Sequence, residues 1–281
     1  MTEKQKNLIT RTITGVLFVA VLVGCLMRPE SMLLLFALIT GLTIWEYGGL
    51  VNQWDDIQVN RFICTLAGVY FFLAVAGYSI GMVNGTCFIP YLITVLYLIL
   101  SELFTKAPNP INNWAYAMFS QMYIALPFST INILAFQTSA QGQYNMLLPL
   151  SVFVFLWVND TGAYCAGSLF GRHKLFPRVS PGKTWEGCIG GAVLVMLAAA
   201  LIGYMTSGDN SLSIPVWMGL GLVVVVFGTL GDLVESLFKR TLGIKDSGNI
   251  LPGHGGMLDR FDSSLMAIPA SVVYIYTISL L

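Results

Sequence analysis

Long apolar runs dominate the chain, and short polar segments separate them. A helix needs about 20 mostly apolar residues to cross the hydrocarbon core of a bilayer. Nine runs come close to this length, and we predict a membrane-spanning helix for each, at about residues 9–27, 31–50, 63–83, 86–104, 114–136, 146–170, 187–206, 215–235 and 263–281. The pattern therefore predicts an all-α, polytopic integral membrane protein with about nine transmembrane helices.

The run at 114–136 differs from the others because polar residues and a proline dilute it. They are Ser120, Gln121, Pro127, Ser129 and Asn132. Polar side chains in a membrane helix are stable when they bond to neighbouring helices. We therefore expect this helix to bury a polar face against the rest of the bundle.

Composition supports a membrane protein. Hydrophobic residues make up 56% of the chain and charged residues only 10%, whereas soluble domains carry about a quarter charged residues. The 14 basic and 14 acidic residues balance, so net charge gives no reason to expect a nucleic-acid partner.

The positions of the basic residues predict the orientation in the membrane. Cytoplasmic loops carry an excess of Lys and Arg. If the N-terminus is cytoplasmic, the nine predicted helices place all 14 lysines and arginines except Arg28 on the cytoplasmic side. We therefore predict a cytoplasmic N-terminus and a C-terminus on the opposite side.

Polar residues are concentrated in the second half of the chain. Residues 1–145 are almost entirely hydrophobic, and we predict that they form a transmembrane scaffold. Residues 146–281 are predicted to form a transmembrane catalytic region with cytoplasmic loops at 171–186 and 237–262.

Asp160 and Glu46 are two of the acidic residues that lie inside predicted helices. Ionisable groups at membrane depth are costly and mark candidate sites. Asp160 interrupts the helix at 146–170, so we predict that it belongs to a site, with a buried acid paired to a basic residue as the alternative. Glu46 lies between Trp45 and Tyr47 at the inner end of the helix at 31–50, where we favour an anchor at the membrane interface.

The loop that follows residue 170 is basic. Gly182-Lys183-Thr184 resembles the end of a P-loop, but Pro177 occupies the position of the required glycine and no strand is predicted before it. We therefore exclude a P-loop NTPase. The loop still combines cations with hydroxyl groups, which suits a polyphosphate; these residues are Arg172, Lys174, Arg178, Ser180, Lys183 and Thr184. The alternative is that the cations only fix topology and contact lipid headgroups.

The richest polar stretch runs from residue 231 to 263. Asp232, Glu235 and Lys239 have the spacing of one helical face, and Asp259 and Asp262 are likewise three residues apart. Carboxylates of this kind, together with phosphate oxygens, are the ligands that Mg²⁺ prefers. Glycines around His254 allow the backbone to approach a ligand closely. We predict that the two acidic pairs meet at one membrane depth; the alternative is a salt-bridged helical hairpin.

These residues form a signature that resembles the phosphatidate cytidylyltransferases, also called CDP-diacylglycerol synthases. The family pattern is Ser-x-x-Lys-Arg, four residues, Lys-Asp-x-Gly, and then Pro-x-His-Gly-Gly-x-x-Asp-Arg-x-Asp. Its positions are filled here by Ser236, Lys239, Arg240, Lys245, Asp246, Gly248, Pro252, His254, Gly255, Gly256, Asp259, Arg260 and Asp262. Two further family stretches match at 159–164 and 180–187, so the resemblance covers about residues 157–264. Gly182 departs from the pattern, since many relatives carry a basic residue there, and this thins the positive charge expected around the nucleotide.

The resemblance implies a reaction between CTP and phosphatidic acid that yields CDP-diacylglycerol and pyrophosphate. It implies Mg²⁺ as cofactor, with two metal ions held by Asp232 and Asp259, and it implies catalytic roles for Asp232, Lys239, Asp259 and Asp262. The expected substrate-binding residues are Asp160, Ser180, Lys183, Thr184, Glu235, Arg240, Lys245, Asp246, His254, Gly255, Gly256 and Arg260. The expected setting is a bacterial inner (plasma) membrane with the active site facing the cytoplasm, membrane lipids as partners and a possible homodimer.

Other functions are compatible with parts of this pattern. An ion-coupled transporter could use Asp160 and Asp232, but the paired interrupted helices typical of such proteins are missing from the sequence. The motif of the CDP-alcohol phosphatidyltransferases is also missing. A cytidylyltransferase for an ether-linked isoprenoid lipid stays open, because the site residues alone do not distinguish the two lipids.

Overall fold

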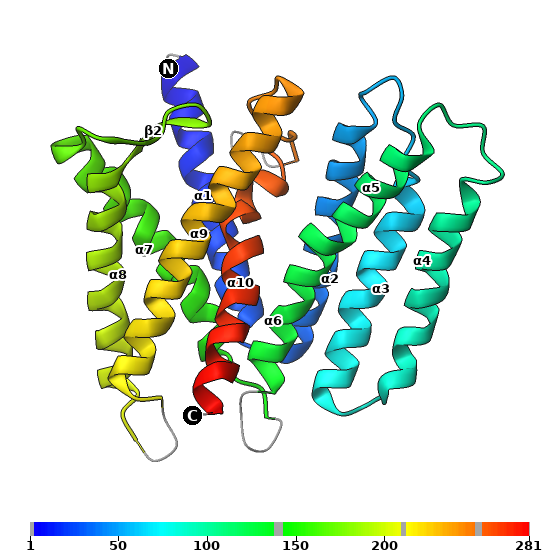
Figure 1. Cartoon of the computed structure of the whole chain (residues 1–281). Helices are drawn as coiled ribbons and strands as arrows, with labels where there is room; N and C mark the ends of the chain where they lie inside the picture. Colours follow the sequence, from blue (N-terminus) through cyan, green and yellow to red (C-terminus); the bar gives the residue numbers. More distant parts are fainter. Residues whose placement is uncertain (1–2, 138–142, 209–211, 251–254, 281) are drawn as a thin grey trace. The chain divides into compact units, whose positions relative to one another are not determined.

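The computed structural model describes residues 3–137, 143–208, 212–250 and 255–280 (Figure 1). Seven of its helices are long and apolar enough to span a membrane, and two shorter apolar helices occur at Thr12–Leu26 and Gly85–Ser101. An all-α membrane protein is therefore confirmed. The count of nine spans and the cytoplasmic N-terminus stay predictions.

The chain divides into two compact units. The first unit comprises Met1–Met146 and Ile244–Phe261, and the second comprises Leu147–Gly243 and Asp262–Leu281. The first break falls next to the predicted boundary at residue 145. The segment Ile244–Phe261, however, packs with the N-terminal half. The predicted division into scaffold and catalytic region stays a prediction about function, and the compact units divide the chain differently.

The first unit is a bundle of helices. Its elements are α1 (Glu3–Leu26), α2 (Pro29–Val51), α3 (Arg61–Ile80), η1 (Gly85–Phe88), α4 (Ile89–Ser101), α5 (Pro110–Ser120), the π-helical turn η2 (Gln121–Ala125) and α6 (Leu126–Phe136). The rings of Phe36, Phe128 and Phe261 meet edge to face, with centroids 5.5 to 6.4 Å apart. This aromatic cluster packs the segment that carries Phe261 against α2 and α6.

The polar face predicted for residues 114–136 is present and buried. The Gln121 side-chain amide donates to the Cys64 carbonyl at 3.0 Å, and the Asn132 amide donates to the Phe72 carbonyl at 3.4 Å. Both bonds join this helix to α3. These interhelical bonds from the amide N–H groups explain how a diluted apolar run still forms a stable membrane helix.

The second unit contains α7 (Leu147–Phe170), β1 (Lys174–Phe176), β2 (Ser180–Thr184), α8 (Trp185–Met205), α9 (Ile214–Leu242) and most of α10 (Leu258–Ser279). Small residues let α7 and α8 pack closely. A Cβ atom added to Gly162 would lie 2.9 Å from the Gly191 Cα, and one added to Gly190 would collide with Ala166. Backbone contact of this kind is typical of membrane helix pairs.

Two predicted loops are shorter in the structure. The loop expected at 171–186 contains an antiparallel hairpin of β1 and β2, and α8 already begins at Trp185 (Figure 1). The loop expected at 237–262 is reduced because α9 continues to Leu242 and α10 starts at Leu258. The prediction from hydropathy marks only where the chain leaves the apolar layer. The helix α9 continues beyond that point until Gly243, whose φ of 70° forms the left-handed C-cap.

Candidate functional site

The basic hairpin is held in a defined shape by Glu186. Its carboxylate accepts the backbone N–H groups of Arg172 and His173 at 3.1 to 3.2 Å and pairs with His173 Nδ1 at 2.5 Å. Thr184 then caps α8, because its hydroxyl oxygen accepts the Gly187 N–H at 3.1 Å. These contacts fix β2, and with it Lys183, at the N-terminal end of α8.

A cavity of about 350 Å³ opens beside this strand. It is lined by Asn159, Asp160, Ala163, Tyr164, Gly167, Ser168, Gly182, Lys183, Thr184, Gly187, Cys188 and Thr229. The structure thus brings together Asp160, Lys183 and Thr184 from the predicted site. Asp160 is exposed to the cavity, which excludes the alternative of a fully buried acid. The volume is within the range of small-molecule sites.

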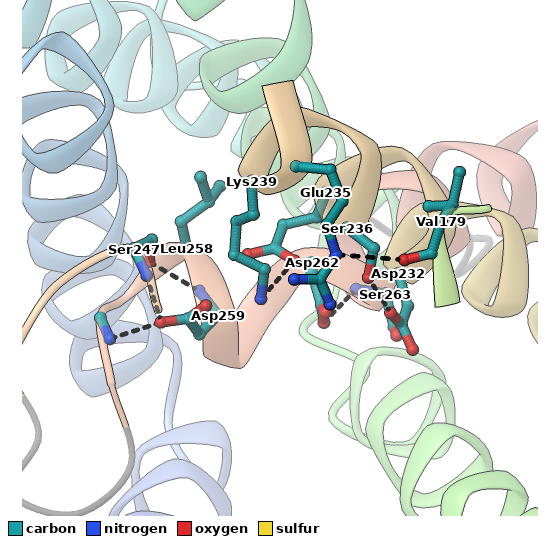
Figure 2. Close-up of polar contacts among 12 residues, drawn as sticks. Val179, Asp232, Glu235, Ser236, Lys239, Ser247, Leu258, Asp259, Asp262 and Ser263 are labelled. Atoms are coloured by element: carbon teal, nitrogen blue, oxygen red, sulfur yellow. Dashed lines mark hydrogen bonds and ion pairs between the residues drawn. The ribbon is translucent and has the colours of Figure 1, made fainter. Parts of the chain in front are cut away.

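An ion pair joins the hairpin to α9. Lys183 Nζ lies 2.5 Å from Asp232 Oδ2. The Ser236 hydroxyl donates to Asp232 Oδ1 at 3.1 Å (Figure 2). Both charged side chains are about one-quarter exposed. Sequence spacing could not predict this pair, because its members are 49 positions apart in the chain. It places a cation and a carboxylate within reach of the same ligand.

The residues predicted to share an acidic helical face, Asp232, Glu235 and Lys239, all lie within the helix α9. Glu235 pairs with Lys239 at 2.7 Å, and the Glu235 side chain is fully buried (Figure 2). Direct contact between Glu235 and a substrate stays a prediction, and the burial of Glu235 disfavours it. In the structure this carboxylate instead orients Lys239. Asp262, on α10, interacts electrostatically with Asp232, Lys239 and Asp160. Arg240, which follows Lys239 on α9, donates to the Val179 carbonyl at 3.4 Å.

Asp259 lies in the first unit and is nearly buried, with 9% of its surface exposed. Its Oδ2 atom accepts the backbone N–H groups of Ser247 and Gly256, each at 2.8 Å (Figure 2). Asp232 belongs to the other unit, so the predicted convergence of Asp232 and Asp259 stays a prediction.

Glu46 is a residue of this region that the sequence interpretation missed. The interfacial anchor predicted for it is wrong, because Glu46 is 8% exposed and its carboxylate accepts hydrogen bonds from Ser247, Met257 and Leu258. The flanking Trp45 and Tyr47 imitate an interfacial aromatic belt, yet Tyr47 is itself completely buried. An acid inside an apolar helix was the signal that could have identified it.

The other predicted residues show few specific contacts. Ser180 is half-buried in β2, while Lys245, Asp246 and Arg260 are exposed in the first unit. Gly255 has φ +82°, which explains the glycine there, and Gly256 is buried. Pro252 and His254 lie outside the described residues.

No complete metal site is visible in the part of the chain that the structure describes, since no three His, Cys, Asp or Glu side chains there form a group that could hold an ion. The site residues nevertheless supply the hard oxygen donors that suit Mg²⁺. In the second unit these donors are Asp160, Asp232 and Asp262.

Comparison with known proteins agrees with the signature. The sequence model of the cytidylyltransferase family matches residues 9–278. The phosphatidate cytidylyltransferase of Staphylococcus aureus (strain COL) is 33% identical over 261 residues, which cover 92% of this chain and 95% of the relative. Proteins with the same name from Staphylococcus haemolyticus and Staphylococcus epidermidis are also 33% identical, over 260 and 263 residues, with the same shares of each chain. With a match that runs almost from end to end, this chain belongs to the cytidylyltransferase family.

Proposed function

We propose that the protein is a phosphatidate cytidylyltransferase, which condenses CTP with phosphatidic acid to give CDP-diacylglycerol and pyrophosphate. The observation that carries the proposal is the cavity lined by Asp160 and Lys183, with Lys183 paired to Asp232, which lies one helical turn before the first residue of the signature, Ser236. The relatives that align with nearly the whole chain carry the same activity in their names.

The chemistry requires neutralisation of charge more than proton transfer. The second pKa of a phosphate monoester is about 6, so the phosphate of phosphatidic acid is already largely dianionic at neutral pH. One of its oxygens forms a bond to the α-phosphorus of CTP, the bond between the α-phosphorus and the bridging oxygen breaks, and pyrophosphate leaves with the electron pair. The main obstacle is the approach of two anions.

The basic residues of the site can lower this obstacle. Lys183 faces the cavity, and Lys239 is oriented by the buried Glu235. Arg240 is attached to the hairpin through the Val179 carbonyl. We propose that these three residues and Arg260 neutralise phosphate oxygens on CTP and on the lipid, and that Ser180, Thr184, Lys245, Asp246, His254, Gly255 and Gly256 contribute to substrate binding.

Mg²⁺ fits the donor set of the proposed site. Asp232 is partly exposed and offers carboxylate oxygens, the donor type that Mg²⁺ binds together with phosphate oxygens and water. We propose that Asp232 and Asp259 each supply oxygen ligands, with two metal ions in the active enzyme. When bound, the metal would neutralise triphosphate charge and stabilise the leaving pyrophosphate.

The proposed setting follows from the substrates. CTP is supplied from the cytoplasm and a lipid phosphate lies at the membrane interface, so we propose an inner-membrane enzyme with a cytoplasmic N-terminus and a cytoplasmic active site. The distribution of basic residues supports this orientation. Homodimer formation remains part of the proposal.

The direct test is an assay of the purified full-length chain in detergent with labelled CTP, phosphatidic acid and Mg²⁺. We expect labelled CDP-diacylglycerol and pyrophosphate in equal amounts, and we expect EDTA to stop the reaction until excess Mg²⁺ is restored. A parallel reaction with an ether-linked isoprenoid lipid phosphate tests the alternative substrate. Ion or solute flux in liposomes without a lipid product would instead identify a transporter.

We predict that Lys183→Gln lowers kcat/KM for CTP by about 100-fold, because the neutral amide cannot stabilise phosphate charge. The matched control is Lys106→Gln, which removes an exposed charge that lies in the first unit, outside the basic hairpin. Steady-state kinetics at saturating phosphatidic acid measure the difference. Equal activity of the two variants would remove Lys183 from the proposed site.

A further inference from the structure

Glu46 is an acid on α2 that the proposed reaction does not use. Its side chain is nearly buried, and burial of a carboxylate is costly unless hydrogen bonds replace its water. Three hydrogen bonds from described residues reach this carboxylate, and their donors lie about 200 positions later in the chain. A helix of the predicted scaffold therefore contacts the signature segment directly.

The two carboxylate oxygens bind both parts of that segment. Oε1 accepts the Ser247 hydroxyl at 2.5 Å and the Leu258 N–H at 3.1 Å, while Oε2 accepts the Met257 N–H at 2.8 Å. Ser247 follows the Lys-Asp pair of the signature, and Met257 and Leu258 immediately precede Asp259. Glu46 thus holds together two stretches that are ten residues apart in sequence.

Ser247 connects Glu46 to Asp259. Its hydroxyl donates to Glu46. The same hydroxyl accepts the Asp259 N–H at 3.3 Å, and the Ser247 backbone N–H donates to Asp259 Oδ2 at 2.8 Å (Figure 2). The Gly256 N–H donates to the same Asp259 oxygen. The orientation of the Asp259 carboxylate therefore depends on a backbone arrangement that Glu46 fixes.

The glycines of the signature match this arrangement. A Cβ atom on Gly256 would collide with Glu46 Oε1 and the Ser247 hydroxyl, and one on Gly248 would lie 2.6 Å from Glu46 Oε2. Neither glycine has a positive φ among the described residues. Space around the Glu46 carboxylate, rather than backbone conformation, explains why these two positions lack side chains.

We infer that Glu46 is a positioning residue, whose carboxylate holds residues 247–248 and 256–258 in the one arrangement that orients Asp259 for catalysis. The catalytic part of this inference rests on the proposed function. The structural part, that Glu46 fixes this segment, is independent of which reaction the protein performs.

The arrangement requires a carboxylate and not only a side chain of the same size. An ionised carboxylate accepts hydrogen bonds at both oxygens, whereas a Gln amide presents one acceptor and one donor. In either amide orientation, the NH₂ group of Glu46→Gln would face the backbone N–H of Met257 or of Leu258. At least one buried backbone donor would then lose its acceptor.

The test compares Glu46→Gln and Glu46→Asp with the control Thr40→Val in the full-length protein in detergent. Thr40 is buried on the same helix, and its hydroxyl donates to the Phe36 carbonyl one turn earlier. We expect Glu46→Gln to raise amide hydrogen exchange at residues 256–258 about tenfold, the effect of one lost hydrogen bond. We expect it to lower kcat about 10- to 100-fold, as for other residues that orient a ligand carboxylate, and to raise the Mg²⁺ concentration that gives half-maximal activity.

Glu46→Asp separates the need for a carboxylate from the need for volume. Asp retains two acceptors but is shorter by one methylene, so we expect it to restore more activity and more exchange protection than Gln. A purely space-filling role would give the reverse order, since Gln has the size of Glu. Thr40→Val should match the wild type in both measurements.

The outcomes separate this inference from the proposed function. Absence of CDP-diacylglycerol synthesis by the wild type would refute the function, while the exchange comparison would still decide whether Glu46 fixes the segment. In an active wild type, unchanged exchange at 256–258 or unchanged kcat and Mg²⁺ dependence in Glu46→Gln would overturn the positioning role. If Glu46→Gln fails to fold, Glu46→Asp decides. Wild-type exchange and kinetics in Glu46→Asp support the inference, whereas complete loss of activity in Glu46→Asp overturns it.

Discussion

Asp232→Asn is expected to reduce CTP:phosphatidate activity by at least about 100-fold while the protein remains folded and inserted. The substitution keeps the size of the side chain but removes its charge. The variant loses the ion pair with Lys183, and it loses an anionic oxygen from the proposed Mg²⁺ ligands. Because the side chain is partly exposed, the loss should affect turnover more than stability.

The control for this variant is Asp55→Asn, which makes the same chemical change at an exposed acid of the first unit. Both proteins should show the same thermal unfolding in detergent, and only Asp232→Asn should lose product formation. Adding Mg²⁺ should not restore wild-type kcat if Asp232 is a ligand in the transition state. Full Mg²⁺-dependent turnover by Asp232→Asn would remove the metal-site proposal.

The sequence predicted the helices well because apolar length is a local property. Every predicted run corresponds to helical structure among the described residues, including the diluted run that became α5, η2 and α6. The ends were less predictable. The predicted run at 215–235 stops before Lys239 and Arg240, whereas α9 continues to Leu242, since these two residues are good helix formers in the last turn.

The site was predictable only where its residues are neighbours in sequence. The helical spacing of Asp232, Glu235 and Lys239 placed them on one face of α9. The partner of Asp232 could not be predicted in this way, because the position of Lys183 depends on a hairpin and a helix pair whose packing is set by tertiary contacts. The strand formed by Ser180–Thr184 was also missed, because it is short and depends on pairing with β1.

Glu46 shows why tertiary contacts limit such predictions. Glu46 lies between two aromatic residues at the end of an apolar run. This local pattern is the same for an interfacial anchor and for a buried carboxylate that accepts hydrogen bonds. The two differ only in what packs against the helix, and that partner lies about 200 positions away.

Gly256→Ala is expected to be as damaging as a change in a catalytic acid, with an activity loss of at least about 100-fold and a lower unfolding temperature. The added methyl group has no space, because it would overlap Glu46 and Ser247. Overpacking of a tight site forces backbone shifts that cost about 1–3 kcal/mol. Here the shift would displace the Gly256 N–H that donates to Asp259.

Gly85→Ala is the matched control, since a Cβ atom there meets no described atom within 4 Å, and it should retain wild-type activity. Glu46→Asp in the Gly256→Ala background provides the sharper test, because a carboxylate shorter by one methylene withdraws from the added methyl group. Residues in contact show non-additive effects in a double-mutant cycle, so the double variant should be more active than the product of the two single losses predicts. Purely additive losses would show that Gly256 is required for a reason other than its contact with Glu46, and activity of Gly256→Ala equal to that of Gly85→Ala would show that the segment can move without cost to catalysis.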